Sequence, residues 1–304
     1  MDLKNKRILI TGGTGFIGKH LVDELLNHNN KLFLITRKRQ QSENDNLKYL
    51  YADLSQLNEN LSEKIKKELK LVDYILYLAA NIPLLSASKE TIFDAKISTF
   101  DPFINFLKFF GNIGNKIIFT STIDVYGYPD KEYDENQSID PLTPYALAKF
   151  VCEKYLQYYC KIYKKEFSIV RFAQVYGPNE PLVRVIPYIL NSAVKNEPFS
   201  LSGSGLDKRK FLYVKDAVQG IIKTALNGNN SIYHIAGSEV DNILNVIRIT
   251  ENVFNKKIII KQKNKEREIQ NTLPNLDKSI KKLGYNPKYT LERGIKEIFN
   301  IMRV

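Results

Sequence analysis

A glycine-rich loop near the start of the chain restricts its fold more than any other feature. The loop reads TGGTGFIG over residues 11–18 and connects a short apolar run to an amphipathic segment. Gly12 permits a tight turn, Gly15 allows a pyrophosphate to approach the backbone, and Gly18 allows close packing of the following helix. Phosphates bind at the positive end of such a helix. The sequence therefore predicts dinucleotide binding through five residues of this loop: Gly12, Gly15, Phe16, Ile17 and Gly18.

The same segment partly matches a second phosphate-binding pattern. Gly13, Gly18 and Lys19 satisfy the G-x-x-x-x-G-K portion of a P-loop. In a P-loop the next residue is Ser or Thr, whose hydroxyl holds a magnesium ion, whereas here it is His20. Nucleoside triphosphate hydrolysis is therefore disfavoured.

Short apolar runs alternate with helix-periodic segments through the first half of the chain. This alternation is typical of βαβ units, which build a parallel sheet with helices on both faces. We therefore expect an α/β fold, a Rossmann-type doubly wound parallel sheet. The expected strands are 6–11, 31–36, 48–52, 74–80, 116–121 and 167–173, and the expected helices are 16–27, 60–69, 91–110 and 145–164.

The alternation becomes less regular after Pro178. Here we expect helices at 183–195, 214–226, 242–255 and 291–301, and strands at 199–202, 231–236 and 257–261. The predicted domains are a dinucleotide-binding domain, 1–175, and a smaller C-terminal α/β substrate lobe, 176–304. Segments near 205–236 are expected to return to the first domain.

The net charge of +12 raises the question of nucleic-acid binding. Residues 256–282 hold nine basic and three acidic residues, and this difference of six is half of the total excess. The segment has neither interleaved aromatic residues nor a nucleic-acid motif. We interpret it as a solvated face that remains compatible with an anionic small substrate, and we expect no nucleic-acid partner.

Cysteine usage and hydropathy indicate the compartment. Cys152 and Cys160 are eight residues apart in one expected helix, too far to bridge, which favours buried thiols in a reducing environment. No apolar run approaches the ~18 residues needed to span a bilayer. We therefore expect a cytoplasmic protein without a membrane partner. With three scattered histidines and two cysteines, no metal site is expected.

The end of the second expected strand bears on which dinucleotide is bound. In NAD-binding domains an acidic residue there accepts a hydrogen bond from the ribose 2′-hydroxyl. This chain has Thr36, Arg37 and Lys38 instead. A 2′-phosphate would meet the guanidinium of Arg37, so NADP is favoured over NAD. A basic surface loop without a cofactor contact would have the same kind of sequence, so NAD remains an alternative.

Two further pairs of residues are candidates for cofactor contacts. Asp53 and Leu54 follow the third expected strand, where Asp53 is placed to meet the adenine. Ala79 and Ala80 stand at the end of the fourth expected strand, where small residues let the backbone pass close to the cofactor.

Tyr145 and Lys149 form the candidate catalytic pair. They are four residues apart in an expected helix, so their side chains lie on one face. A free phenol, with a pKa of about 10, is only ~0.1% ionised at neutral pH. An ammonium about 4 Å away contributes roughly 4 kcal/mol, about three pKa units, at an effective dielectric constant of ~20. Lys149 would thus make Tyr145 a usable proton acceptor, and Thr122 or Ser121, after the fifth strand, would align the substrate oxygen.

Seven motifs carry a resemblance that covers nearly the whole chain. They are TGGTGFIG (11–18), LAA (78–80), STIDVYG (121–127), PYALAK (144–149), VYGP (175–178), RKFLYVKDAV (209–218) and LGYNP (283–287). Together and in this order they resemble the extended short-chain dehydrogenase/reductases, the NAD(P)-dependent nucleotide-sugar epimerase/dehydratase group.

This resemblance assigns roles residue by residue. It implies that Tyr145 is the acid/base, that Lys149 is its partner and that Thr122 is the substrate-orienting hydroxyl. It also implies that Arg209 contacts the pyrophosphate of a nucleotide sugar. From the residues alone, the basic run 208–210 could equally be a solvated surface. The family further implies a homodimer through a four-helix bundle, to which the helices at 91–110 and 145–164 could contribute.

Two positions depart from the family pattern. Sugar 4,6-dehydratases that resemble the 121–127 loop have Asp-Glu directly after the threonine, whereas this chain has Ile123 and Asp124. Because Ile123 cannot donate a proton, dehydration is disfavoured. Gln174 stands where many members have an asparagine that touches the substrate, and its longer amide reshapes the pocket.

The expected function is hydride exchange between a nicotinamide cofactor and C4 of a nucleotide sugar. The missing dehydratase acid and the basic end of the second strand together favour an NADPH-using 4-ketoreductase. A 4-epimerase with tightly bound NAD is the alternative. A non-catalytic protein that senses NAD(P) belongs to another class, and the intact set of Thr122, Tyr145 and Lys149 argues against it.

Overall fold

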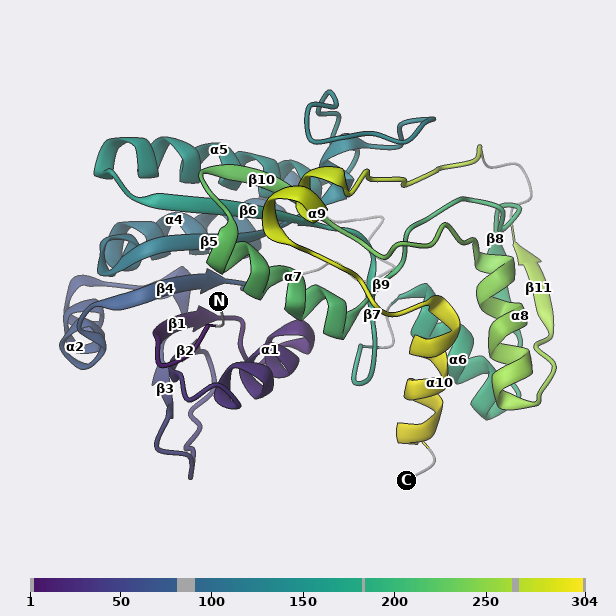
Figure 1. Cartoon of the computed structure of the whole chain (residues 1–304), viewed down its shortest axis with the longest axis horizontal. Helices are drawn as coiled ribbons and strands as arrows, with labels where there is room; N and C mark the ends of the chain where they lie inside the picture. Colours follow the sequence, from purple (N-terminus) through teal and green to yellow (C-terminus); the bar gives the residue numbers. More distant parts are fainter. Residues whose placement is uncertain (1–2, 81–90, 182–183, 264–267, 303–304) are drawn as a thin grey trace.

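The computed structural model describes residues 3–80, 91–181, 184–263 and 268–302 (Figure 1). Its centre is a seven-stranded sheet with the strand order β10-β6-β5-β4-β1-β2-β3, in which every pairing is parallel. The strands are β1 (Arg7–Thr11), β2 (Lys31–Thr36), β3 (Leu47–Tyr51), β4 (Val72–Tyr77), β5 (Gly114–Thr122), β6 (Glu166–Phe172) and β10 (Ser231–Ile235). The expected Rossmann-type doubly wound sheet is confirmed, with its switch point between β1 and β4.

Both faces of the sheet are buried, which explains why its strands read as continuous apolar runs. In β1, Ile8 and Ile10 join the core on one face, while Leu9 joins the core on the other. The first core contains α1 (Phe16–Leu26) and α7 (Val214–Asn227). The second contains α2 (Glu59–Leu69), α4 (Asp101–Phe110) and α5 (Pro144–Tyr163).

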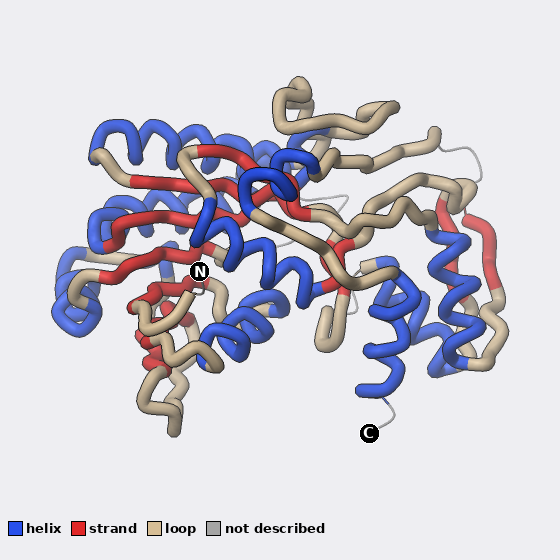
Figure 2. Tube along the Cα trace, in the orientation of Figure 1, coloured by secondary structure: helices blue, strands red, loops and turns tan. Residues whose placement is uncertain are grey.

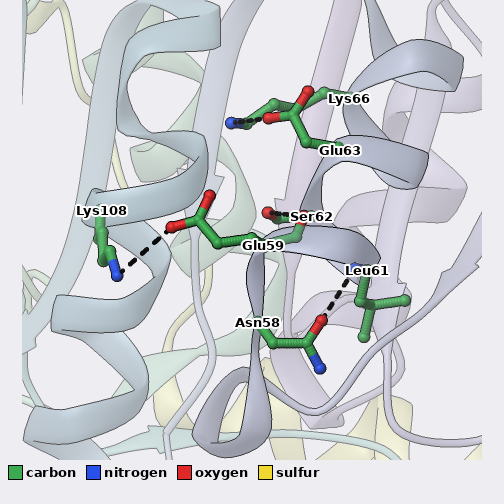
Figure 3. A network of polar contacts seen from close by, with 7 residues as sticks. All are labelled: Asn58, Glu59, Leu61, Ser62, Glu63, Lys66 and Lys108. Atoms are coloured by element: carbon green, nitrogen blue, oxygen red, sulfur yellow. Dashed lines mark hydrogen bonds and ion pairs between the residues drawn. The ribbon is translucent and has the colours of Figure 1, made fainter.

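Helix α2 shows how polar residues fix the ends of these helices. The Asn58 side chain caps the helix by accepting a hydrogen bond from the backbone of Leu61 at 3.0 Å (Figure 3). Lys66 pairs with Glu63 on the same helix at 2.7 Å, and Lys108 of α4 lies 3.7 Å from Glu59. These exposed ion pairs add little stability, so the buried apolar face of α2 holds it on the sheet.

The remaining elements gather at one end of the molecule, on the right in Figure 2. Helices α6, α8 and α10 pack on one another there, and β8 and β11 form a separate two-stranded parallel sheet. Two short strands, β7 and β9, lie between this group and the main sheet, and helix α9 packs on β10 and α7 (Figure 1). Their bounds are β7 (Val175–Tyr176), α6 (Val185–Lys195), β8 (Phe199–Ser202), β9 (Leu212–Tyr213), α8 (Ile243–Phe254), β11 (Ile260–Lys263), α9 (Asp277–Leu283) and α10 (Leu291–Met302).

The two-domain division at residue 175 stays a prediction. Strand β10 pairs with β6, and helix α7 covers the main sheet, so both lie within its layers. Residue 183 of the expected helix 183–195, and residues 264–267 of the basic segment, lie outside the described part of the chain.

Several elements differ from the sequence-based expectation. The helix expected at 91–110 is divided into α3 (Ile92–Ala95), a π-helical turn at Lys96–Phe100 and α4. The strand expected at 257–261 begins three residues later, as β11. Helix α9 and strands β7 and β9 were not expected, because a helix of seven residues and strands of two residues are too short to show their periodicity.

Both cysteines lie buried on α5 as free thiols, as expected. Burial raises the pKa of Cys152 and of Cys160 to about 12, so neither is a reactive thiolate at neutral pH. Among the described helices, none combines the length and the apolar character that crossing a membrane requires.

Candidate active site

The glycine loop lies at the switch point of the sheet, where β1 and β4 end side by side. Gly12 has a φ of +73°, and a Cβ there would stand 2.7 Å from the backbone nitrogen of Ala79. That nitrogen donates a hydrogen bond to the Thr11 hydroxyl at 3.2 Å, and Leu78 donates to the Thr11 carbonyl at 3.1 Å. Ala79 is partly buried and Ala80 is exposed beside the loop. The loop therefore needs glycine at position 12 and touches the end of β4.

Helix α1 begins at Phe16, directly after its N-cap residue Gly15, and no described side chain caps its first backbone N–H groups. A Cβ on Gly15 would meet only the Gly12 carbonyl oxygen, at 3.2 Å, whereas one on Gly18 would lie 2.1 Å from that oxygen. Gly15 thus borders open space and Gly18 does not. Phe16 and Ile17, both partly buried, form the first turn of the helix. This arrangement can hold a pyrophosphate against free N–H donors.

The other candidate cofactor residues lie along the same edge of the sheet. Arg37 is exposed directly after β2. Asp53 caps a short 3₁₀ turn, Leu54–Gln56, by accepting hydrogen bonds from the backbone and hydroxyl of Ser55 at 2.9 and 2.7 Å. Leu54 is buried. The structure thus brings Arg37 and Asp53 to the ends of β2 and β3, next to the glycine loop.

Helix α5 carries the candidate catalytic pair. The Thr143 side chain caps the helix at the backbone of Ala146, at 3.1 Å, and Pro144 occupies its first position. Tyr145 is partly buried in the first turn, while Lys149, one turn on, is only 1% exposed. The Lys149 ammonium donates a hydrogen bond to the carbonyl of Thr120 in β5, at 2.8 Å.

The environment of Lys149 changes its protonation. Burial lowers its pKa from the usual 10.5 to about 8, against the opposing effect of Cys152 and Glu153. The ammonium also lies 4.7 Å above the Phe119 ring, a contact that favours the charged form. Lys149 is therefore still mostly protonated at pH 7.

Ser121 and Thr122 are the last two residues of β5, which is longer than expected because it pairs with β6 up to Thr122 and Phe172. The Thr122 hydroxyl accepts a hydrogen bond from the backbone of Asp124 at 3.1 Å and so begins the 3₁₀ turn Ile123–Tyr126. The buried Ser121 hydroxyl has no hydrogen-bond partner within the described residues. Two hydroxyls thus follow one another at the carboxyl end of β5.

The position after Thr122 offers no acid. The Ile123 side chain is only 3% exposed and belongs to the apolar core between the sheet and α1 and α7, whereas Asp124 is exposed to solvent. A proton donor is therefore absent directly after Thr122.

Arg209 and Gln174 lie in the segments that leave the main sheet. The backbone of Gln174 accepts a hydrogen bond from Leu212 at 2.9 Å. Arg209 exchanges two backbone hydrogen bonds with Asp241, and its guanidinium lies 3.8 Å from an Asp207 oxygen. The Arg209 Nε is buried and has no hydrogen-bond partner within the described residues. A partly buried guanidinium whose Nε has no described partner is suited to an anionic ligand.

A buried polar network beside α5 was not predicted. It joins Glu153 of α5, Arg171 of β6, Tyr126 and His234 of β10 through side-chain hydrogen bonds. The sequence motifs assign no role to Tyr126 or to Arg171. One signal was present: Glu153 follows Lys149 by four residues and therefore shares its helix face.

Metal ligation finds no support in the described part of the chain, where no group of three or more His, Cys, Asp or Glu side chains could hold an ion.

The parallel sheet, the glycine loop at its switch point and the tyrosine–lysine pair on α5 define a dinucleotide-binding α/β enzyme fold. Residues 8–236 match the model of the NAD dependent epimerase/dehydratase family, and the chain belongs to this family. The resemblance to the extended short-chain dehydrogenase/reductases is thereby confirmed.

Relatives of several activities align along nearly the whole chain. A putative UDP-glucose 4-epimerase of Methanocaldococcus jannaschii is 30% identical, with 97% of this chain and 98% of the relative covered. The dTDP-4-dehydro-6-deoxyglucose reductase of Escherichia coli is 27% identical, with 100% and 99% covered. Human dTDP-D-glucose 4,6-dehydratase is 27% identical, with 96% and 88% covered.

Solved structures agree with the family. The UDP-glucose 4-epimerase of Thermotoga maritima with UDP-glucose has a TM-score of 0.83 and 25% identity, with 98% of this chain and 100% of that chain covered. A UDP-N-acetylglucosamine 4-epimerase of Methanobrevibacter ruminantium, in complex with UDP-N-acetylmuramic acid, has a TM-score of 0.84 and 26% identity, with 98% and 99% covered.

The glycine geometry generates a paired prediction. Gly18→Ala is expected to lower the free energy of unfolding by about 1–3 kcal/mol, because its Cβ collides with backbone atoms. Gly15→Ala is expected to cost about 1 kcal/mol or less, yet to weaken NAD binding at least tenfold, because its Cβ enters the space over the α1 N-terminus. Urea unfolding and calorimetric titration with NAD measure the two effects. Unchanged NAD affinity in Gly15→Ala would contradict the placement of the pyrophosphate.

The lowered pKa of Lys149 generates a prediction on stability. The pKa of Lys149 is lower in the folded than in the unfolded chain. Burial of the ammonium therefore lowers the free energy of unfolding by its full amount below pH 8, and this loss disappears as the pH rises toward 10.5. Lys149→Met is therefore expected to raise the free energy of unfolding at pH 7 by roughly 1–3 kcal/mol, and by much less near pH 10. Urea unfolding at both pH values measures this. Lys154→Met, an exposed position on the same helix, is the control and should show no such pH dependence.

Proposed function

We propose that this protein is an NAD-dependent nucleotide-sugar 4-epimerase. The observation that carries the proposal is the placement of partly buried Tyr145 and buried, still charged Lys149 one turn apart on α5, with the Lys149 ammonium bonded to the Thr120 carbonyl near the carboxyl end of β5. The names of the relatives support the choice of reaction, since epimerases are found among both the sequence relatives and the solved structures.

The cofactor residues fit a dinucleotide. Gly15 borders open space at the N-terminus of α1, and free N–H groups there would bind the pyrophosphate. Asp53 and Leu54 would contact the adenine end, and Ala79 and Ala80 would let the backbone approach the cofactor. When bound, NAD accepts a hydride from C4 of the sugar and returns it.

Tyr145 is the proposed acid/base. Its phenolate oxygen removes the proton from the sugar 4-hydroxyl as the hydride leaves, and its hydroxyl gives the proton back when the alcohol re-forms. The positive charge of Lys149 stabilises the phenolate, and the Thr120 carbonyl holds that ammonium in place. The Thr122 hydroxyl, or alternatively that of Ser121, hydrogen-bonds the sugar oxygen and aligns it for transfer.

Arg209 is the proposed anchor for the substrate diphosphate. Its Nε is buried without a described partner, so a phosphate oxygen would satisfy a donor that otherwise carries a desolvation cost. Gln174 would touch the sugar and shape the pocket. A nucleotide sugar, whose diphosphate carries two negative charges, matches this chemistry.

Dehydration and reduction are the competing reactions. Ile123 occupies the position of the dehydratase acid and is buried in the core, which disfavours elimination of water. A 4-ketoreductase that uses NADPH remains the second candidate, because exposed Arg37 follows β2 in a run of basic residues and the Escherichia coli reductase aligns with the full chain. The two reactions share every catalytic group and differ in whether the hydride returns to the same carbon.

The decisive assay follows both the deuterium label at C4 of the sugar and the redox state of the cofactor. Incubation with NAD and C4-deuterated UDP-glucose, UDP-glucuronic acid or UDP-N-acetylglucosamine is expected to give the 4-epimer with deuterium retained and no net reduction of NAD, as read by NMR and absorbance. Stoichiometric oxidation of NADPH by a 4-keto nucleotide sugar would instead establish the reductase. Cofactor binding without turnover over the panel would favour an NAD(P) sensor. Tyr145→Phe is expected to lower kcat about 10²–10⁴-fold, while Tyr158→Phe, at an exposed position of the same helix, should retain wild-type activity.

We also propose a homodimer formed through α3, the π-helical turn and α5. These elements touch one another and expose large apolar side chains, with Phe93 71% and Tyr158 66% exposed. Others on this face are Ile92, Ile97, Tyr155, Ile162 and Tyr163. A two-fold axis would place two such helix pairs together as a four-helix bundle and remove this face from water.

The dimer face can be tested by charge. Ile97→Glu combined with Tyr158→Glu is expected to convert a dimer into a monomer with unchanged far-UV circular dichroism, because two buried carboxylates per protomer oppose association. Light scattering after gel filtration measures the mass. Leu71→Glu, at another exposed apolar position, is the control and should stay dimeric. A wild-type protein that is monomeric at micromolar concentration would contradict the proposal.

The reducing compartment expected from the cysteines is likewise part of this proposal. Cys152 and Cys160 are free and buried, which suits a cytoplasmic protein.

A further inference from the structure

The buried network beside α5 begins with an ion pair. Arg171 donates two hydrogen bonds to the Glu153 carboxylate, at 3.0 and 2.5 Å, and both side chains are almost fully buried. Desolvation lowers the pKa of Arg171, but the bonds to Glu153 and Tyr126 more than compensate and raise it overall. The pair is bidentate and shielded from solvent, which makes its geometry rigid.

Tyr126 connects this pair to His234. The Tyr126 hydroxyl accepts a hydrogen bond from Arg171 Nη1 at 2.5 Å and lies 2.7 Å from His234 Nε2. His234 Nδ1 lies 3.1 Å from the Asn275 carbonyl, which can only accept, so Nδ1 carries the proton. Burial lowers the pKa of His234 to about 3, which keeps the ring neutral and leaves Nε2 as an acceptor. The Tyr126 hydroxyl therefore donates a hydrogen bond to His234 Nε2 and accepts one from Arg171.

The network joins the two parts of the candidate active site. Glu153 lies on α5, on the face that carries Tyr145 and Lys149, whereas Tyr126 ends the 3₁₀ turn that begins at Thr122. Between them, Arg171 sits in β6, next to β5. The distance between the substrate-orienting hydroxyl and the acid/base helix therefore depends on contacts through these four side chains.

We propose that Tyr126 is a positioning residue, whose hydroxyl, held between Arg171 and His234, fixes the turn that begins at Thr122 relative to helix α5. The proposal rests on the proposed function in one respect, since it assumes that Thr122 aligns the substrate. Tyr126 itself is buried in the core.

Tyr133 supplies a matched control within the same cluster. Its ring packs on Tyr126 and His234, with centroid distances of 4.9 and 5.8 Å, and it is equally buried. Its hydroxyl has no hydrogen-bond partner within the described residues. Tyr133→Phe and Tyr126→Phe thus remove the same atom from the same environment, and only the second breaks the network.

The kinetic test uses these two variants with Thr122→Ala. Tyr126→Phe is expected to lower kcat at least tenfold with KM changed less than threefold, while Tyr133→Phe stays within twofold of wild type. If Tyr126 acts through Thr122, adding Tyr126→Phe to Thr122→Ala should cause little further loss, so the two effects are non-additive. The proposal would be overturned if the losses of kcat in Tyr126→Phe and Thr122→Ala multiplied in the double variant. Equal losses of kcat in Tyr126→Phe and Tyr133→Phe would overturn it as well.

A second measurement does not depend on activity. In Tyr126→Phe the backbone amides of Asp124 and Gly127, which are hydrogen-bonded within the turn at 3.1 and 3.2 Å, are expected to exchange with deuterium at least tenfold faster than in Tyr133→Phe. Should the wild type show no epimerase activity, the proposed function fails while this difference still tests the positioning. Equal exchange in both variants would refute the positioning whatever the reaction is.

Substitutions of His234, the partner of the Tyr126 hydroxyl, provide variants in case Tyr126→Phe does not fold. His234→Gln keeps an acceptor near the position of Nε2 and is expected to retain most of kcat, whereas His234→Leu should behave like Tyr126→Phe. Equal kcat in these two variants would also overturn the proposal.

Discussion

The burial of charged groups on one face of α5 governs much of this structure. Lys149 and Glu153 follow Tyr145 at intervals of four residues, so the three side chains share one face of the helix, and those of Lys149 and Glu153 are buried. Burying an unpaired charge is costly, so each of the two charged groups needs a partner on a strand. Lys149 has the Thr120 carbonyl of β5, and Glu153 has Arg171 of β6. These two contacts determine how α5 lies across the sheet and where Tyr145 emerges.

Features with strong local signals were predictable from the sequence. Strand β2 and strand β8 lie where expected, residue for residue, because an apolar run marks β2 and an alternation of apolar and polar residues marks β8. The glycine loop was predictable because three glycines at set spacings serve three backbone requirements, and the structure shows two of them directly at Gly12 and Gly18. The helix face shared by Tyr145 and Lys149 follows from spacing alone.

What could not be predicted depends on contacts between distant segments. Tyr126, Arg171 and His234 are far apart in the chain, and only the strand order β5-β6-β10 brings them together. Nothing near Tyr126 in the sequence indicates that its hydroxyl has two partners. The choice between NAD and NADP stays a prediction for a similar reason: Arg37 is exposed, and its neighbours in space do not distinguish a phosphate contact from a solvated side chain.

The strand order also has a consequence for how the protein is made. Strand β10, which carries His234, is the edge strand next to β6 among the described residues and is the last strand of the main sheet to leave the ribosome. At a synthesis rate of ~5–20 residues per second, several seconds separate the emergence of Tyr126 from that of His234. Once Arg171 has also been made, the nascent sheet has Tyr126 and Arg171 without their imidazole acceptor, and its edge at β6 is open until β10 follows. Completion of the fold therefore waits for residues translated long after the glycine loop, and a chain truncated before β10 would be a natural substrate for chaperones.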